Sequence, residues 1–550
     1  MSRKAFYTAL SVVILLAACA PLFTVNCIGG HDITYHLLRI EALREGILAG
    51  RPFLRINMLF LGGTGYASSL FYPDLLLYIP ALLRVFGLGI DLSFHIFIAV
   101  CIVLGYMSCY LCVRYITKSD TAATAAAIIF TLCQYHLDDI YVRSAVGEYT
   151  AVIFVPLVIA GLYDLVSEEF ARPWLLVLGM TGVLLCHTIT AVICIVLCIA
   201  MVLIYIRQLA AKPKVFLRLA LAAFATLAVT AFYWLPVLEM LAGGGFSRDF
   251  TFDLGYESVK LWEVFYNRTG RMGIAVFLFL LIRLVIKKSM RFADICTICG
   301  LLLTLFSTSL IPWERLQGML GFIQFPWRVY VAAGPLLAVG GGIYASILAA
   351  EISSGDSEVT VSGERLVLIM TAGIMLCSGV CVLQRNDQPY YSYSNDYFAY
   401  APYTAEIIGG EWLPVAAGDR EALIAGADTA VLDNGTELKV DRYKNEMRLS
   451  SVPDTAEYAD VPFVYYKGYA ADDLDSGAGL AVSAGGVNGR VRVYTDGAQN
   501  IRVYYKGTLI QHISDAVSII CIIALAACFI MLIRREKMMA KKQSDNESQV

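Results

Sequence analysis

The sequence predicts a polytopic α-helical membrane protein of about twelve transmembrane helices with one extracytoplasmic β-sandwich domain. Of its 550 residues, 58% are hydrophobic and 16% are charged, and the mean hydropathy is +0.66. An average soluble domain is roughly 45 to 50% apolar and roughly 25% charged, which excludes a single soluble globular enzyme. The apolar residues fall in runs of about 20, the length that crosses a bilayer. Polar residues gather between the runs and in one block over residues 386–513.

The twelve predicted spans are residues 5–25, 91–113, 120–136, 149–166, 173–187, 189–206, 216–236, 272–286, 292–311, 328–350, 366–384 and 514–533. The stretch 71–88 is harder to place because Pro73, Asp74, Pro80 and Arg84 interrupt it. If it does not cross, the Lys and Arg clusters all fall on one side, as the positive-inside rule requires. We therefore expect twelve crossings with both termini in the cytoplasm.

This topology gives four parts: a transmembrane domain over 1–385, an extracytoplasmic β-sandwich over 386–513, a last transmembrane helix over 514–534 and a cytoplasmic basic tail over 535–550. The predicted outer loops are 26–90, 136–148, 237–271 and 312–327. Alternating residues in 489–494 and 501–505, broken by the pairs Asn488-Gly489 and Asp496-Gly497, indicate antiparallel strands and tight turns. Leu16–Cys19 resembles a lipoprotein cleavage box, but the apolar run continues past Cys19, which favours a span.

Several function classes are disfavoured by composition. A net charge of −3 leaves no basic surface that could neutralise several phosphates, so nucleic acid is not an expected partner. The polar block contains no cysteine, and a disulfide framework is therefore not expected. Cys296 and Cys299 form an isolated CxxC within an apolar run, which favours buried small residues over a metal or redox site. The chain has neither a P-loop nor a dinucleotide-binding fingerprint.

The first outer loop contains Asp32, His36 and Arg39. Apolar residues at helical spacing predict an amphipathic helix along the membrane surface, closed by Gly50 and Pro52. Asp32 would lie at its N-terminal end, where the helix dipole keeps a carboxylate ionised, and His36 and Arg39 would follow on the same face. The alternative is that Asp32 only caps the helix while the other two side chains face water or headgroups.

The second outer loop brings together Asp138, Asp139, Arg143 and Glu148. Paired carboxylates can hold a divalent metal, or one can act as a base while an arginine neutralises a phosphate. The alternative is a solvated loop. A third outer segment ends in Gln324–Arg328, at the mouth of the next span. There Arg328 is a candidate to bind the phosphate of a lipid-linked substrate, or it reaches out to a headgroup.

With Asp32, His36 and Arg39 at this spacing, the chain resembles the membrane-bound GT-C type glycosyltransferase superfamily. Through Gln324–Arg328 and Val461–Tyr469 it resembles more closely the YfhO-like bacterial proteins often labelled "6-pyruvoyl-tetrahydropterin synthase-related"; the pterin part of that label has no support in a multi-pass chain. The resemblance implies a catalytic acidic residue in the first loop, here Asp32. It also implies a second acidic site like Asp138 and Asp139, with arginines that bind phosphate. Many relatives have adjacent Asp-Glu in the first loop, where this chain has His31 and Ile33 beside Asp32.

We therefore predict a membrane glycosyltransferase that moves a sugar from a polyprenyl-phosphate carrier to an extracytoplasmic acceptor, a cell-envelope glycan or protein. The predicted site residues are Asp32 and His36 as catalytic groups, Arg39, Arg143, Arg328 and Gln324 as substrate or phosphate ligands, and Asp138, Asp139 and Glu148 as a metal or second acidic site. No cofactor is certain, and a divalent metal remains open. The alternatives are a transporter or flippase of a lipid-linked envelope precursor and a non-catalytic envelope protein.

Overall fold

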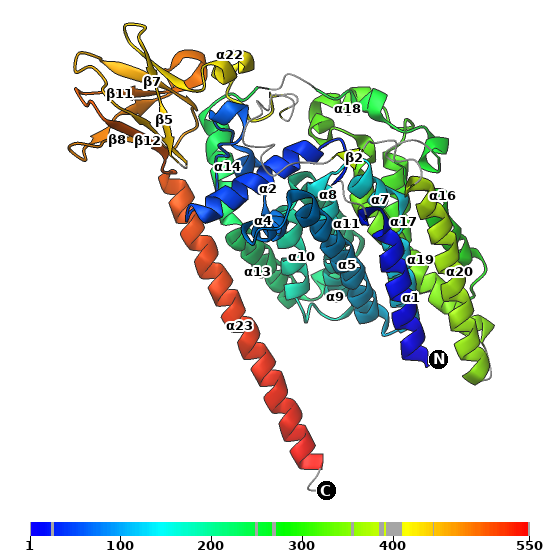
Figure 1. The fold of residues 1–550 in the computed structure, drawn as a ribbon. Helices are drawn as coiled ribbons and strands as arrows, with labels where there is room; N and C mark the ends of the chain where they lie inside the picture. The colour runs from blue at the N-terminus through cyan, green and yellow to red at the C-terminus, as the bar shows by residue number, and fades with distance from the viewer. Residues whose placement is uncertain are drawn as a thin grey trace.

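The computed structural model describes residues 2–23, 27–247, 251–266, 271–353, 357–383, 390–391, 407, 410–443 and 445–547. A helical bundle forms most of the molecule, and a β-sheet domain follows it (Figure 1). The helices up to the middle of the bundle are α1 (Arg3–Ala18), α2 (Ile33–Leu48), α3 (Ser68–Phe71), α4 (Tyr78–Val85), α5 (Ile90–Thr117), α6 (Asp120–Thr131), α7 (Gln134–Tyr141), α8 (Val146–Val152), α9 (Val155–Ser167), α10 (Trp174–Leu184) and α11 (Thr188–Ile204). Those that follow are α12 (Ile206–Ala210), α13 (Pro213–Val229), α14 (Ala231–Gly243), α15 (Leu254–Glu257), α16 (Ile274–Leu281), α17 (Arg291–Phe306), α18 (Trp313–Leu320), α19 (Tyr330–Ile352), α20 (Ser357–Leu383), α22 (Arg420–Ala425) and α23 (Leu509–Glu547).

Within these ranges, four helical segments are long and apolar enough to cross a membrane, or up to five if the bent pair α13–α14 is one span. The four are Ile90–Thr117, Val146–Ser167, Pro326–Ile352 and Leu509–Cys528. Other predicted spans coincide with shorter helices, such as α6 with 12 residues and α10 with 11. At about 1.5 Å per residue these are shorter than the roughly 30 Å hydrocarbon layer. The number of about twelve crossings therefore stays a prediction.

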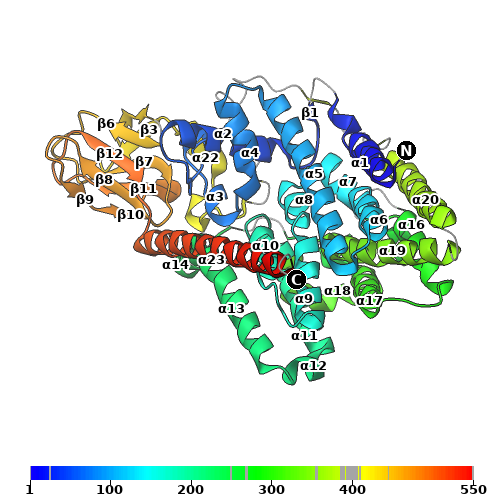
Figure 2. The ribbon, with the colours of Figure 1, turned by 90° about the horizontal axis from the view of Figure 1, so that it is seen from below.

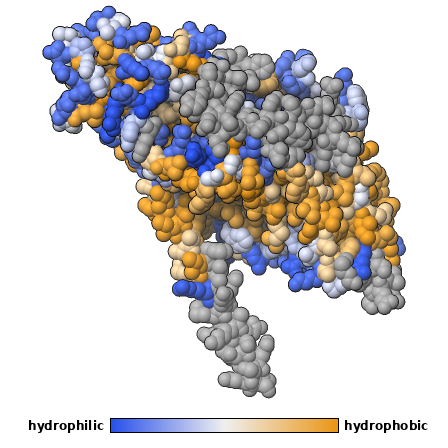
Figure 3. Space-filling view, viewed as in Figure 1, coloured by the Kyte–Doolittle hydropathy of each residue, from blue (hydrophilic) through white to orange (hydrophobic). Residues whose placement is uncertain are grey.

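On the face of the bundle seen in Figure 3, apolar side chains form a belt with hydrophilic surface above and below it. Such a belt is what a bilayer covers in a membrane protein. The N-terminus and the end of α23 lie at one end of the bundle, and the sheet domain lies at the other (Figure 1). This arrangement matches the predicted placement of both termini opposite the β-domain, whereas the compartment of each side stays a prediction.

The stretch 71–88 folds into short pieces rather than one long helix: a 3-10 turn over Leu75–Leu77 and the eight-residue α4. Two buried ion pairs fasten it to α2. Asp74 accepts a hydrogen bond from Arg39, with Asp74 Oδ1 2.5 Å from Arg39 Nη2. Arg84 forms an ion pair with Glu41. Because α4 is too short to cross a bilayer, the expectation that this stretch does not span is consistent with the structure.

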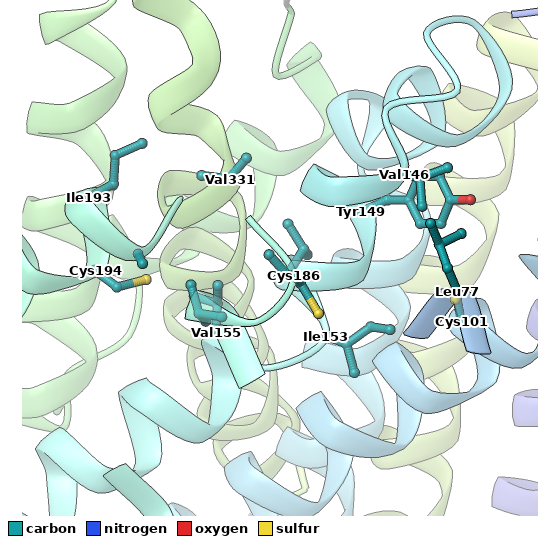
Figure 4. Close-up of a cluster of buried hydrophobic side chains, with 14 of the residues drawn as sticks. Leu77, Cys101, Val146, Tyr149, Ile153, Val155, Cys186, Ile193, Cys194 and Val331 are labelled. Atoms are coloured by element: carbon teal, nitrogen blue, oxygen red, sulfur yellow. The ribbon is translucent and has the colours of Figure 1, made fainter. Parts of the chain in front are cut away.

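The centre of the bundle is α19, which is buried along almost its whole length between α6 and α17. Gly342 allows this packing, since an added Cβ would lie 2.5 Å from the backbone nitrogen of Ala126. The same continuous apolar core includes Val146 and Tyr149 of α8, which lie close to Leu77 and Cys101 (Figure 4). This core supports the ends of α8 and α19 on which the candidate site is built.

The C-terminal domain is a β-sandwich of two five-stranded antiparallel sheets, in the orders β10-β11-β7-β3-β4 and β5-β6-β12-β8-β9. Its strands are β3 (Thr429–Leu432), β4 (Glu437–Lys439), β5 (Asp441–Tyr443), β6 (Glu446–Leu449), β7 (Tyr458–Val464), β8 (Tyr469–Asp473), β9 (Gly479–Leu480), β10 (Val482–Ser483), β11 (Arg490–Tyr494) and β12 (Ile501–Tyr505). The predicted strands 490–494 and 501–505 are confirmed. They belong to different sheets, so the Asp496-Gly497 turn connects the sheets instead of closing a hairpin. The predicted domain start, residue 386, lies outside the described residues.

Two strands and several hydrogen bonds dock the β-domain on the bundle. The short strands β1 (Cys27–Ile28) and β2 (Tyr390–Tyr391) pair with each other, which joins the first outer loop to the start of the polar block. The Val464 backbone nitrogen donates to Thr64 O at 2.8 Å. The helix α23, which leaves the domain, lies beside α13 and α14 (Figure 2). The sandwich is therefore held against the same end of the bundle as α2.

Candidate functional site

The three predicted outer segments converge at the end of the bundle nearest the β-domain. The Asp32 backbone nitrogen donates to Arg143 O at 3.0 Å, which binds the first segment to the second. Gly30 lets them approach, since a Cβ there would lie 2.0 Å from Ser144 Oγ. Arg328 Nε donates to Glu148 Oε1 at 2.9 Å, which binds the second segment to the third. The predicted convergence of these residues is confirmed in space.

Glu148 is the centre of this site, because it accepts hydrogen bonds from two arginines. Arg143 donates to both Glu148 oxygens, at 2.8 and 3.1 Å, and Arg328 shares one of them. Tyr135 donates a further hydrogen bond at 2.8 Å. The second segment is thus not a solvated loop: it is the end of α7 and the start of α8, and Glu148, Arg143 and Arg328 are all buried. Two guanidinium groups share the Glu148 carboxylate here, and Arg143 also pairs with Asp139.

Gln324 positions Arg328. Its Oε1 accepts from Arg328 Nη1 at 2.6 Å, and its Nε2 donates to Glu411 Oε1 at 3.0 Å. Gln324 has φ +67, in the left-handed region that non-glycine residues seldom adopt. The predicted role of Gln324 as a direct ligand therefore shifts to that of a residue that orients the arginine. The Arg328 Nη2 atom makes no hydrogen bond to any residue that the structure describes.

Asp32 is the accessible carboxylate of the site, and its side chain is exposed while Glu148 is buried. It precedes α2 as predicted, but it makes no capping hydrogen bond. The surrounding protein desolvates the carboxylate and raises its pKa above the usual value, although Arg143 opposes the shift. Asp32 therefore occupies the predicted position at the start of α2 without capping it through a side-chain hydrogen bond, and desolvation is the largest influence on its pKa.

His36 and Arg39 lie on one buried face of α2, so that the helix does not simply rest on a membrane surface. Arg39 donates to Asp74, to the Tyr72 and Pro73 carbonyl oxygens, and to His36 Nδ1 at 3.2 Å. With these partners, Arg39 has little capacity left for a phosphate. Burial and the adjacent guanidinium lower the pKa of His36 well below its usual value. Neutral His36 accepts at Nδ1 and carries its proton on Nε2, so its free ring nitrogen is a hydrogen-bond donor, and its predicted catalytic role stays a prediction.

The predicted metal site does not form. Asp139 accepts from Arg143 Nη1 at 2.5 Å, and burial raises the pKa of Asp139 well above its usual value. Asp138 turns away from it, toward Arg271, whose Nε lies 3.8 Å from Asp138 Oδ2. In the described ranges, no three His, Cys, Asp or Glu side chains are grouped so that they could hold a metal ion. Arginines take the places that a cation would need.

Four residues of this region were not predicted from the sequence: Tyr72, Asp74, His187 and Trp412. The Tyr72 ring lies 5.8 Å from that of His36, 6.1 Å from that of His187 and 6.2 Å from that of Trp412. A signal existed for Asp74, because an acidic residue in an apolar run marks a paired or functional position. None existed for Trp412, since it is 340 residues distant from Tyr72 in the chain.

Solved structures with a likeness to this chain include the arabinofuranosyltransferase AftD from Mycobacteria, with 18% identity, a TM-score of 0.44 and coverage of 71% of this chain and 27% of AftD. Another is ArnT from Cupriavidus metallidurans bound to undecaprenyl phosphate, with 14% identity, a TM-score of 0.42 and coverage of 78% and 80%. A third is the oligosaccharyltransferase AglB from Archaeoglobus fulgidus, with 12% identity, a TM-score of 0.39 and coverage of 72% and 57%.

This chain spans about a quarter of the length of AftD. All three TM-scores lie below 0.5, so these likenesses establish neither its fold nor its activity. No curated protein matches the chain. The closer resemblance to YfhO-like proteins stays a prediction, because the family model that matches is a different one. That model covers residues 3–396, which include the three segments of the site, and the chain therefore belongs to the family of unknown function DUF6541.

Proposed function

We propose that this chain is a membrane glycosyltransferase that transfers a sugar from a polyprenyl-phosphate carrier to an acceptor hydroxyl outside the cytoplasm. One observation carries the proposal: an accessible carboxylate, Asp32, lies next to Arg143, which shares the Glu148 carboxylate with Arg328. Group transfer from a lipid phosphate requires a base for the acceptor and cations for the departing phosphate. The site supplies both at the end of an apolar bundle.

Asp32 is the base in this mechanism. A carboxylate with a raised pKa is a stronger base than an ordinary aspartate, and an accessible one can be reached by an acceptor. Asp32 takes the proton of the acceptor hydroxyl as that oxygen forms a bond to the anomeric carbon. The bond between the anomeric carbon and the phosphate oxygen breaks, and its electron pair leaves with the polyprenyl phosphate.

Arg328 and Arg143 bind that phosphate. Arg143 is paired with Asp139 as well as with Glu148. Arg328 has Glu148 as its carboxylate partner in the described residues, so the Arg328 guanidinium is the group that favours a phosphate gaining negative charge as it departs. Arg328 Nη2 is the donor that its protein partners in the described residues leave available. Phe325 lies under the Arg328 guanidinium at 5.0 Å from the ring centroid and helps to hold the group in place.

The test is transfer by the purified full-length chain in lipid nanodiscs, with radiolabelled polyprenyl-phosphate sugars as donors and a cell-envelope glycan fraction as acceptor. We expect wild type to transfer label. Transfer by Asp32→Asn should be slower by a factor of about 10²–10⁴, the usual contribution of a general base. The matched control is Glu45→Gln, which makes the same chemical change at an exposed position of the same helix.

Equal rates for Asp32→Asn and Glu45→Gln would contradict the assignment of the base. Transport of an intact lipid-linked precursor across the nanodisc or vesicle membrane, with no sugar transfer, would instead support the flippase alternative.

A further inference from the structure

Beside the charged pair lies a group of uncharged donors and aromatic rings: His36, Tyr72, His187 and Trp412. Tyr72 and Trp412 are half-buried, so each presents part of its ring to the surface. His36 and His187 are 1% and 7% exposed. The four residues come from α2, from the turn after α3, from the start of α11 and from the segment before the sandwich. Such a set is unlike the interior of a helical bundle, where polar groups are paired with one another.

Both histidines are locked in the same tautomer. His36 Nδ1 accepts from Arg39 Nη1 at 3.2 Å. His187 Nδ1 accepts from the Thr190 backbone nitrogen at 3.3 Å. In each ring the proton therefore lies on Nε2, which makes no hydrogen bond to any described residue. The molecule thus holds two buried imidazole N–H donors that are fixed in direction and have no protein acceptor in the described ranges.

The Tyr72 hydroxyl is held between them by a close approach to α8. An added Cβ at Gly147 would lie 2.0 Å from Tyr72 Oη, so only glycine leaves room for the phenol. Gly147 directly precedes Glu148, and the hydroxyl is therefore next to the residue that pairs both arginines. This contact joins the uncharged donors to the proposed phosphate site.

Trp412 adds a flat face. It stacks on Phe71 with ring centroids 5.8 Å apart and an interplanar angle of 9°. Its backbone has φ +64, and the preceding residue, Glu411, accepts the hydrogen bond of Gln324. The protein therefore places this indole in an uncommon conformation directly beside the residue that orients Arg328.

We propose that His36, Tyr72, His187 and Trp412 form a subsite for an uncharged sugar ring. The inference rests on the proposed glycosyl transfer and names the class of sugar. Sugar hydroxyls accept hydrogen bonds from neutral N–H and O–H donors, and the apolar face of a pyranose or furanose packs on an aromatic ring. The four groups bring no charge of their own, and the guanidinium of Arg39, which bonds His36 and lies over the Tyr72 ring, is paired with Asp74. The subsite therefore favours a neutral sugar over a uronic acid or an amino sugar.

The experiment measures binding without turnover. Saturation-transfer NMR is recorded on the full-length chain in nanodiscs with a panel of neutral methyl glycosides, methyl glucuronide and methyl glucosaminide. The variants are Trp412→Ala, His187→Ala and Tyr72→Phe, and the control is Trp262→Ala, an exposed tryptophan of an outer loop. Undecaprenyl phosphate binding is measured on every preparation, which reports folding and the separate phosphate site.

We expect at least one neutral glycoside to bind wild type and Trp262→Ala, and the charged glycosides to bind at least 10-fold more weakly. Trp412→Ala and His187→Ala should each weaken binding of the neutral glycoside about 10-fold, and Tyr72→Phe should weaken it less. Binding of undecaprenyl phosphate should be unchanged in all three variants. Unaltered glycoside binding in the variants, a preference for a charged sugar, or a panel without any binder would overturn the subsite. A wild-type protein that does not bind undecaprenyl phosphate would instead count against the proposed function.

Discussion

Two buried arginine sites lie close together in this molecule, and they differ in what is left for a ligand. Arg39 is surrounded, because Asp74, two carbonyl oxygens and His36 use its donors. Arg143 and Arg328 share Glu148 and lie against the accessible Asp32. The Arg39–Asp74 ion pair fastens α2 to the stretch 71–88. At the other site, Arg328 Nη2 stays available as a charged N–H donor, without a partner in the described residues.

This difference shows that a buried arginine indicates a ligand site only when some of its N–H donors have no partner in the protein. In the sequence, Arg39 and Arg328 looked alike as phosphate ligands. The partners decide between them, since a guanidinium with all donors engaged can bind an anion only by losing partners it already has. On this comparison we propose Arg328, and not Arg39, as the phosphate ligand.

The largest effect should come from Glu148→Gln. This change leaves two buried guanidinium groups without their shared carboxylate, and removing one partner of a buried ion pair costs about 3–5 kcal/mol. We expect a large fall in the temperature of thermal denaturation in detergent micelles. A melting temperature equal to that of wild type would show that the arginines do not depend on Glu148.

Asp74→Asn should cost less, about 1–3 kcal/mol, because Arg39 keeps its carbonyl acceptors and the amide still accepts. Thermal denaturation gives the stability, and undecaprenyl phosphate binding by the folded fraction should equal that of wild type. A loss of phosphate binding in this variant would place Arg39 in the ligand site after all.

The pH dependence of transfer separates the two sites further. Asp32 acts as a base only when it is deprotonated, and its surroundings raise its pKa. The groups whose charges act on it are His31, Arg143, Glu148 and Arg328. We expect kcat/KM to fall about 10-fold per pH unit below the pKa of Asp32, at a higher pH than for an ordinary aspartate. An acidic limb at or below the usual aspartate range would contradict the role of Asp32.

The smallest effect should come from Gly50→Ala, which tests the helix that carries both Arg39 and Asp32. Gly50 ends α2 at φ +75, and no atom lies where its Cβ would be. An alanine there costs about 1–2 kcal/mol of backbone strain. A small drop in melting temperature with full transfer activity is expected, and an unchanged melting temperature would show that the left-handed turn is not needed.

Local patterns predicted the local structure well. The period-two alternation in 490–494 and 501–505 became β11 and β12, and the start of α2 after Asp32 and its end before Gly50 were confirmed. Hydropathy could not count the crossings, since it does not show where a helix breaks, as at the 71° bend between α13 and α14.

The site was predictable only in part. The three segments could be assigned to one side because charged groups avoid hydrocarbon, and they do meet. Their pairing could not be predicted, because Arg328 and Glu148 are 180 residues apart and Gln324 contacts Glu411 across 87. For the same reason, the carboxylates of Asp138 and Asp139 looked like a metal site until their arginine partners were placed.

The most direct test of the account is undecaprenyl phosphate binding by the full-length chain in nanodiscs, measured by native mass spectrometry. Arg328→Gln should bind at least about 10-fold more weakly than wild type, because it loses a charge-assisted donor. Asp32→Asn and Lys260→Gln, an exposed control, should bind as wild type does. Equal binding by wild type and Arg328→Gln would contradict the claim that this arginine pair holds the phosphate of a lipid carrier.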